Sequence, residues 1–201
     1  MTNLLISDQE YIDEDFKDIS QNEDEIVNTR FENCTFTHCN FTESTFRKCS
    51  FFECEFSKCN LSLLNVSYSS FRDVTFHECK LVGIDWTRAA WSGLNFPATL
   101  NFHHSVLNDS VFFGLYLAQC NLIECKLQAV DFSEAQCEAA DFSGSDFTHA
   151  TFHHTRLTGA NFAWAHGYNI NVLNNEVKNA RFTLPEAATL LASLGIEIID
   201  E

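Results

Sequence analysis

The sequence predicts a repeat fold, because one five-residue unit recurs along most of the chain. A large apolar residue or a cysteine occupies every fifth position from Ile26 to Phe96 and, after one inserted residue, from Phe102 to Phe162. Sixteen of the 20 phenylalanines lie at these positions. Helices repeat apolar residues every three or four positions and strands every second, so a strict period of five indicates a repeat architecture.

A second position, two residues before each large one, holds a small residue. In the first half these residues are Thr29, Cys34, Cys39, Ser44, Cys49, Cys54 and Cys59. In the second half they are Ala135, Ala140, Ser145, Ala150, Thr155, Ala160 and Ala165. Each unit therefore reads small, polar, large apolar, polar, polar.

This unit resembles the pentapeptide-repeat family, whose loose pattern is Ala-(Asp/Asn)-Leu-X-X. Its best matches are the segments 140–144 and 160–164. The resemblance implies an all-β fold, a right-handed quadrilateral β-helix of about seven coils. Four units would complete one square coil, with residue n lying over residue n+20. One large and one small inward side chain per unit suit a chain that turns a corner in each unit. Neighbouring coils should then lie roughly 4.8 Å apart.

We expect three segments in the chain. Residues 1–25 hold nine acidic residues and one basic residue, Lys17, which predicts either a flexible acidic arm or an irregular first coil that caps the N-terminal end. Residues 26–167 should form the repeat β-helix. Residues 168–201 should form a C-terminal cap, which prevents open-ended stacking of coils.

The cap carries signals for a helix and a strand. Thr183-Leu184-Pro185-Glu186 has the form of a capping box, so a helix should follow and end at Leu194, before Gly195. Ile196–Ile199 reads as a short strand. The segment is more apolar than a cap alone requires, so we expect a homodimer through it; the alternative is a cap without a dimer. The expected interface consists of Leu184, Ala188, Leu191, Leu194, Ile196 and Ile198.

The period breaks once, between Phe96 and Phe102. Pro97 cannot donate a ladder hydrogen bond, so a bulge or a short projecting turn is expected there. This register-break loop comprises Pro97, Ala98, Thr99 and Asn101. It is either a structural defect or a binding feature.

The cysteine and histidine patterns favour structure over chemistry. Eight of the nine cysteines occupy the small position and Cys137 the large one, so we interpret them as buried small hydrophobes rather than metal ligands. Adjacent outward histidines, His103-His104 and His153-His154, could bind a metal, but exposed repeat positions accept most polar residues. We expect no metal site, no cofactor and no enzyme activity, because no catalytic motif or water-excluding pocket is indicated.

The formal net charge of −16 argues against nucleic acid or an anionic membrane as a direct partner and favours a basic protein surface. The sequence shows neither an apolar run near the length of a membrane span nor a cleavable signal sequence, so we expect a cytoplasmic protein.

Within the family, the chain is most similar to the topoisomerase-protecting group, which includes the Qnr quinolone-resistance proteins and the microcin immunity protein McbG. The similarity rests on a single coil stack closed by residues 174–178, 185–187 and 194–198. It implies a C-terminal dimer and an acidic rod that mimics duplex DNA. Such a rod binds DNA gyrase or topoisomerase IV and either inhibits the enzyme or protects it from a quinolone or a peptide toxin.

The acidic residues must gather on one face for this mimicry. Residues 26–167 hold fourteen acids and nine bases, whereas a duplex carries one charge per roughly 1.7 Å. With one inserted residue, the expected acidic face consists of Glu32, Glu53, Asp73, Asp131 and Glu134. Arg30 and Arg72 share that face. The alternative function is a rigid protein–protein interaction module with a partner other than a topoisomerase.

Overall fold

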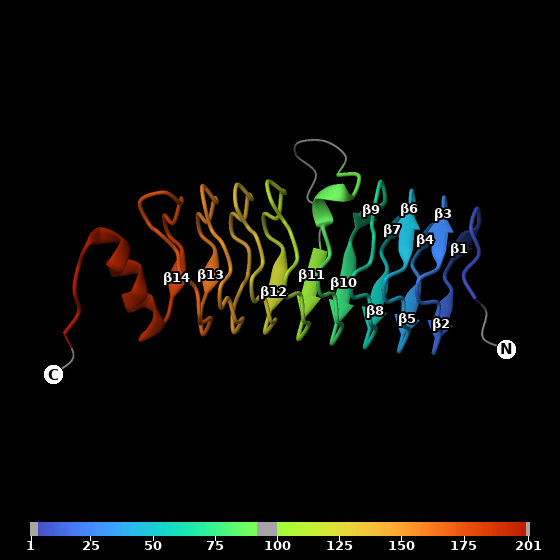
Figure 1. Cartoon of the computed structure of the whole chain (residues 1–201), viewed down its shortest axis with the longest axis horizontal. Helices are drawn as coiled ribbons and strands as arrows, with labels where there is room; N and C mark the ends of the chain where they lie inside the picture. Colours follow the sequence, from blue (N-terminus) through green and yellow to red (C-terminus); the bar gives the residue numbers. More distant parts are fainter. Residues whose placement is uncertain (1–3, 92–99, 200–201) are drawn as a thin grey trace.

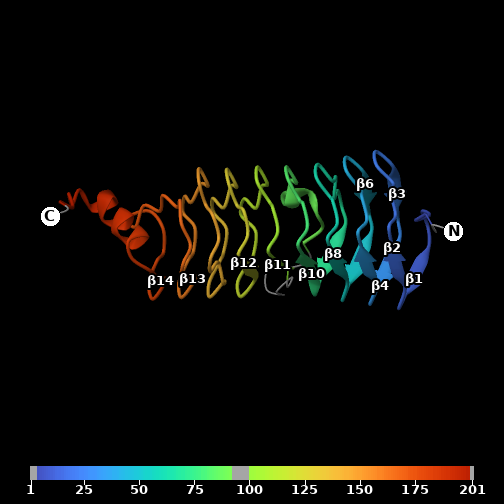
Figure 2. The same ribbon diagram turned by 90° about the horizontal axis from the view of Figure 1, so that it is seen from below.

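The computed structural model describes residues 4–91 and 100–199. The chain forms a right-handed quadrilateral β-helix of about 8 coils, followed by a short helix near the C-terminus. The coils stack into a straight rod with the two chain ends at opposite ends (Figure 1). A view turned by 90° shows the same stack and the helix beyond the last coil (Figure 2). The predicted fold class is confirmed.

Parallel sheets run along the rod, and we name its four faces after them. Face A carries β1 (Glu10–Ile12), β4 (Arg30–Glu32), β7 (Ser50–Phe52) and β9 (Ser70–Arg72). Face B carries β2 (Asp15–Lys17), β5 (Thr35–Thr37), β8 (Glu55–Ser57), β10 (Val74–His77), β11 (Leu100–His103) and β12 (Asn121–Ile123). Face C is joined by bridges such as Ser20 to Asn40, and face D by β3 (Glu25–Val27) and β6 (Thr45–Arg47). The strands β13 (Asn161–Phe162) and β14 (Arg181–Phe182) pair at the C-terminal end.

The large apolar residues form columns of stacked rings inside the rod. On face B, Phe36 lies between Phe16 and Phe56, with ring centroids 4.9 and 4.4 Å away. On face A, Phe51 lies 4.8 Å from Phe31 and 5.1 Å from Phe71. These separations match the strand spacing, as expected when each strand aligns with the equivalent strand of the next coil. The expected stacking of residue n over residue n+20 is confirmed in this part of the rod.

The corners of the coils use left-handed backbone conformations. Asn33 and Glu53, for example, have φ values of 50° and 51°. This conformation costs roughly 1–2 kcal/mol for most residues and less for Asn and Asp. The backbone N–H of most of these corner residues donates to a carbonyl of the next coil, as Asn33 does to Phe52 at 2.9 Å. The inter-coil hydrogen bond therefore helps to offset the strain of each corner.

The small inward position holds a compact side chain, which in many coils also donates a hydrogen bond. The Cys34 thiol lies 3.4 Å from the carbonyl oxygen of Tyr11 in the previous coil and 3.3 Å from that of Glu32. The Ser69 hydroxyl donates in the same way to the carbonyl of Phe46 at 2.7 Å. All nine cysteines lie within the described residues, where they are buried and form no disulfide. The predicted role of the cysteines as small core residues is confirmed.

The register break is larger than the sequence period suggests. Phe76 pairs with Phe102 across β10 and β11, so these partners are 26 residues apart and six residues, rather than one, are additional to a 20-residue coil. Asn101 is a regular residue of β11 that pairs with Thr75, so the bulge predicted at Asn101 is wrong. Phe96, Pro97, Ala98 and Thr99 lie outside the described residues. The sequence period indicated only one inserted residue, because Phe96 follows Trp91 at a spacing of five.

Before the break, the chain adapts to two tryptophans. Trp86 begins a 3-10 turn, η1 (Trp86–Arg88), and its ring is buried and stacked on Phe112 at 5.9 Å. The Trp91 indole N–H donates to the carbonyl of Trp86 at 2.8 Å. Asp85 caps the turn by accepting a hydrogen bond from the Thr87 N–H. These contacts position the chain at the start of the longer coil.

The acidic N-terminal segment is a coil of the rod. The strands β1 and β2 pair in register with β4 and β5, and Phe16 and Ile19 are buried. Gln21 interrupts the period, but its side-chain amide accepts from the Leu5 N–H at 2.6 Å and donates to the Leu5 carbonyl at 3.1 Å. Of the two alternatives for residues 1–25, the flexible arm is therefore wrong for residues 4–25.

The C-terminal segment ends in a 3-10 helix, η2 (Glu186–Leu194), which Gly195 terminates with φ of 71°. The predicted helix end is confirmed, but the capping box is wrong, because Pro185 precedes the helix and Thr183 accepts from the Trp164 N–H instead. Ile196–Ile199 is not a strand in the chain as described. None of the helices in the described parts of the chain has the length and apolar character that a membrane crossing requires.

Candidate protein-interaction surface

Acidic side chains follow the corner between faces A and B over the first four coils. Asp13, Glu53 and Asp73 each come directly after a strand of face A, and Glu32 ends β4. The strand register places these residues in successive coils. We call Asp13, Glu32, Glu53 and Asp73 the acidic edge.

Basic side chains partly neutralise the acidic edge. Arg30 contacts Glu10 at 2.9 Å and also pairs with Glu32. The Arg72 guanidinium lies 3.9 Å from Asp73 and 4.5 Å from the centroid of the Phe52 ring. Exposed ion pairs of this kind are worth little on average. The two arginines therefore lower the negative charge of the acidic edge while contributing little to stability.

The predicted acidic face is only partly correct. Glu32, Glu53 and Asp73 lie on the acidic edge, but Asp131 belongs to face D, where it bridges Val111, which in turn bridges Asp85. Glu134 follows at the corner between faces D and A. The physical reason is the longer coil. It contains six additional residues, whereas the sequence period predicts one, and the difference of five residues equals one repeat unit. Every later residue is therefore shifted by one face.

The first coil strengthens the acidic edge in a way that the predicted face omitted. Asp13 accepts a hydrogen bond from the Asn33 amide at 2.6 Å, which aligns it with the edge. Asp15, on face B, accepts from Thr35 in the same manner. The pairing of β1 and β2 thus places the acids of residues 4–25 on the rod itself. Their density in the sequence was the available signal, but it did not show that they are ordered.

A shallow groove lies at the corner between faces B and C in the C-terminal half. It is lined by Glu124, Lys126, Ser143, Gly144, Asp146, Trp164 and His166. Burial raises the pKa of Asp146, but hydrogen bonds from Thr148 and Gln128 outweigh that effect and lower it. Trp164 is 76% exposed. Sequence reasoning did not single out this groove, because its lining residues come from three coils.

The C-terminal segment presents apolar side chains to solvent. Leu184 is 78% exposed, Leu194 48% and Ile198 50%. Leu191 and Ile196 are also exposed, while Ala188 is partly buried. Leu190 packs on the core, and Phe182 stacks on Phe162 at 5.0 Å. The helix therefore caps the last coil with one side and leaves an apolar surface on the other.

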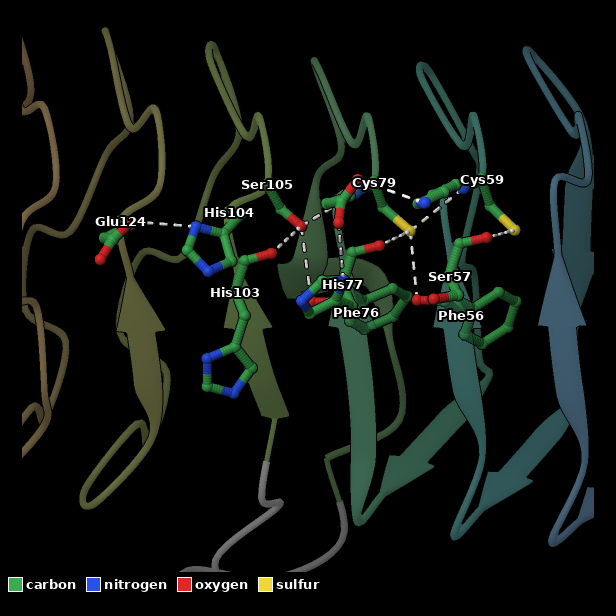
Figure 3. A network of polar contacts seen from close by, with 12 residues as sticks. Phe56, Ser57, Cys59, Phe76, His77, Cys79, His103, His104, Ser105 and Glu124 are labelled. Atoms are coloured by element: carbon green, nitrogen blue, oxygen red, sulfur yellow. Dashed lines mark hydrogen bonds and ion pairs between the residues drawn. The ribbon is translucent and has the colours of Figure 1, made fainter.

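The histidines are distributed over different faces. His103 ends β11 on face B and pairs with His77 of β10, and His104 follows at the next corner (Figure 3). His153 and His154 contact each other with ring centroids 4.1 Å apart, and His153 also contacts Asn174. Among the described residues, no group of three or more candidate ligands is arranged to hold a metal ion.

Comparison with known proteins places this architecture in a family. The family model described as the pentapeptide repeat region matches residues 29–100 and 95–162. These matches cover well over half of the chain, so it belongs to the pentapeptide-repeat family. Among curated proteins, none matches the sequence.

Solved structures of QnrB1, described as a plasmid-mediated fluoroquinolone resistance protein, are similar to this chain. A trypsin-treated variant of QnrB1 has a TM-score of 0.67 and 17% identity, and the match covers 92% of this chain and 100% of that chain. Full-length QnrB1 has a TM-score of 0.56 and 16% identity, with 93% and 100% covered. At these identities, the likeness shows that the two proteins share a fold.

Proposed function

We propose that the protein binds a type II topoisomerase, DNA gyrase or topoisomerase IV, at the surface that normally holds DNA. Bound there, it inhibits the enzyme or protects it from a poison such as a quinolone or a peptide toxin. The observation that supports this proposal most is the likeness to QnrB1, which extends over the whole of that chain and 92% of this one. A cytoplasmic location fits this proposal.

The charge distribution supports a basic partner surface. The net charge is −16, and the acids of the first coil and the acidic edge concentrate at the N-terminal half of the rod. A surface that binds duplex DNA presents cationic side chains to phosphates. An acidic rod would be attracted to such a surface, and the attraction should weaken as salt is added.

The apolar C-terminal surface supports a homodimer. Leu184, Leu194 and Ile198 are exposed, and burying their side chains against a second surface would be favourable. The expected partner is a second copy of the chain, because the opposite side of η2 already packs on the last coil through Leu190. A tail-to-tail dimer would double the length of the acidic rod.

A supercoiling assay with purified DNA gyrase tests the proposal. Titration of the protein should inhibit supercoiling at micromolar concentration or below, or should restore activity in the presence of a fluoroquinolone. If neither effect occurs up to tens of micromolar with the dimer confirmed, the topoisomerase proposal fails. The protein would then be an interaction module for another partner.

A pair of double variants tests whether the acidic edge is the contact surface. Glu53→Lys with Asp73→Lys reverses two charges on the edge and should raise the concentration needed for half-inhibition at least tenfold. Asp131→Lys with Glu134→Lys makes the same change one face away and should alter it less than twofold. The opposite ranking would place the contact on face D.

A further inference from the structure

Three histidines lie close together on and beside face B, where the longer coil begins and ends, as Figure 3 shows. His77 ends β10, His103 ends β11, and the two residues are register partners. His104 follows at the corner. The 26-residue offset between β10 and β11 creates this arrangement. With a single inserted residue, His77 would have lain over residue 98 instead.

The rings of His77 and His104 are spaced like two ligands of one ion. Their centroids are 5.5 Å apart and their planes are inclined by 71°. Zinc–nitrogen bonds are about 2.0–2.1 Å long, so two imidazoles bound to one tetrahedral ion have centroids roughly 5 Å apart. A shared ion would require both Nε2 atoms to turn toward the space between the two rings. Both side chains are accessible to it, being 40% and 48% exposed.

A carboxylate lies beside Nδ1 of each ring. Nδ1 of His104 lies 3.0 Å from Glu124 Oε2, and Nδ1 of His77 lies 3.4 Å from Glu78 Oε1. Metal-binding histidines usually donate their second ring N–H to such a carboxylate, which fixes the tautomer and raises the basicity of the other nitrogen. A proton on Nδ1 of each ring would face this carboxylate and leave Nε2 without a proton. The Nε2 lone pair of each ring is then the metal-binding atom.

We propose that His77 and His104 together bind one late first-row divalent cation, such as Zn²⁺, through their Nε2 atoms. Water completes the coordination, because the described residues supply no third preassembled ligand. Imidazole ligands favour Zn²⁺, Cu²⁺ and Ni²⁺, whereas Mg²⁺ and Ca²⁺ favour oxygen ligands. Lys58 lies 3.8 Å from Glu78, so Glu124 is the less encumbered of the two supporting carboxylates. The ion would join two successive coils of face B.

Isothermal titration of the full-length protein with ZnCl₂ in a non-chelating buffer tests the site. The expected result is one Zn²⁺ per chain, with no comparable binding of Mg²⁺. His77→Asn and His104→Asn should each weaken binding at least tenfold. Glu124→Gln should weaken it roughly tenfold, because removal of a supporting carboxylate typically costs 10–100-fold in metal affinity. Circular dichroism would confirm that each variant remains folded.

The second histidine pair provides a matched control. His153→Asn with His154→Asn removes two exposed imidazoles whose centroids are 4.1 Å apart, and it should leave zinc affinity unchanged. Absence of zinc binding would overturn the proposal. So would unchanged affinity in the His77 and His104 variants, or a loss of binding in the control. The test is independent of the topoisomerase proposal, because no enzyme is present.

Discussion

Individual ring stacks hold the coils together at the residue scale. A phenylalanine inside a ring column, such as Phe51, contacts the ring above and the ring below, so its removal affects three coils. Phe36 is fully buried between Phe16 and Phe56. Phe113, by contrast, is 45% exposed and extends outward from a neighbouring repeat position. Both residues are phenylalanines and they differ in burial, which makes them a matched pair.

Phe36→Ala should therefore lower the free energy of unfolding by about 3–5 kcal/mol, because it leaves a cavity in a packed column. Phe113→Ala should lower it by less than about 1 kcal/mol. Urea denaturation followed by circular dichroism measures both values. Equal effects would contradict the stacked core.

Two glycines with left-handed backbone conformations form a second matched pair, which differs in the space available for a side chain. Gly159 and Gly167 have φ values of 72° and 71°, so alanine is strained at either position by roughly 1–2 kcal/mol. A Cβ at Gly159 would meet nothing within 4 Å, whereas at Gly167 it would lie 2.9 Å from the backbone nitrogen of Thr148. Gly167→Ala should therefore lower the melting temperature more than Gly159→Ala. Identical melting temperatures would show that the Thr148 backbone moves without cost.

At the scale of elements, the C-terminal helix η2 covers the last coil and presents an apolar side to solvent. Its Leu190 side packs on the last coil, and its other side leaves Leu194 and neighbouring apolar residues exposed. A repeat stack needs a terminal element of this kind, because an uncovered coil would accept another chain. One element thus combines a cap with a proposed dimer interface.

Leu194→Asp should convert the dimer to a monomer, because a carboxylate buried without a partner would oppose association. Light scattering coupled to size-exclusion chromatography would measure the molar mass. Leu63→Asp is the control, since Leu63 is similarly exposed, at 53%, but lies on the side of the rod. A wild-type mass equal to one chain would contradict the dimer before any variant is made.

The whole molecule carries a column of buried thiols that limits its stability at high pH. Burial raises the pKa of Cys120 to about 11 and that of Cys125 to about 12, from 9.0. A thiol whose folded pKa is raised contributes stability that is fully present below pH 9 and is lost as the pH rises toward the folded value. The rod should therefore become less stable between about pH 9 and pH 11.

Cys125→Ser tests this contribution, because serine already occupies the equivalent position in the coils before and after, at Ser105 and Ser145. Urea denaturation at pH 8 and pH 10.5 measures the loss of unfolding free energy. The loss should be smaller in the variant by about 1–2 kcal/mol, since each pKa unit corresponds to 1.36 kcal/mol. An unchanged loss would assign the alkaline effect to other groups.

The repeat unit, the inward and outward positions, the buried cysteines and the end of the last helix at Gly195 could all be predicted from the sequence. These features depend on local pattern, because a coil that turns every five residues imposes its period directly on the chain. The likeness of residues 4–25 to a coil was also visible at Phe16. That these residues are ordered, however, is shown only by the pairing of β1 and β2 with strands of the next coil.

The register after the longer coil, by contrast, is visible only in the folded chain. A period of five cannot distinguish one additional residue from six, because five residues return the pattern to the same phase while moving it by one face. That difference separated Asp131 and Glu134 from the acidic edge, and it brought His77 next to His104. Which side chains share a face is set by pairing between coils, which the one-dimensional pattern does not contain.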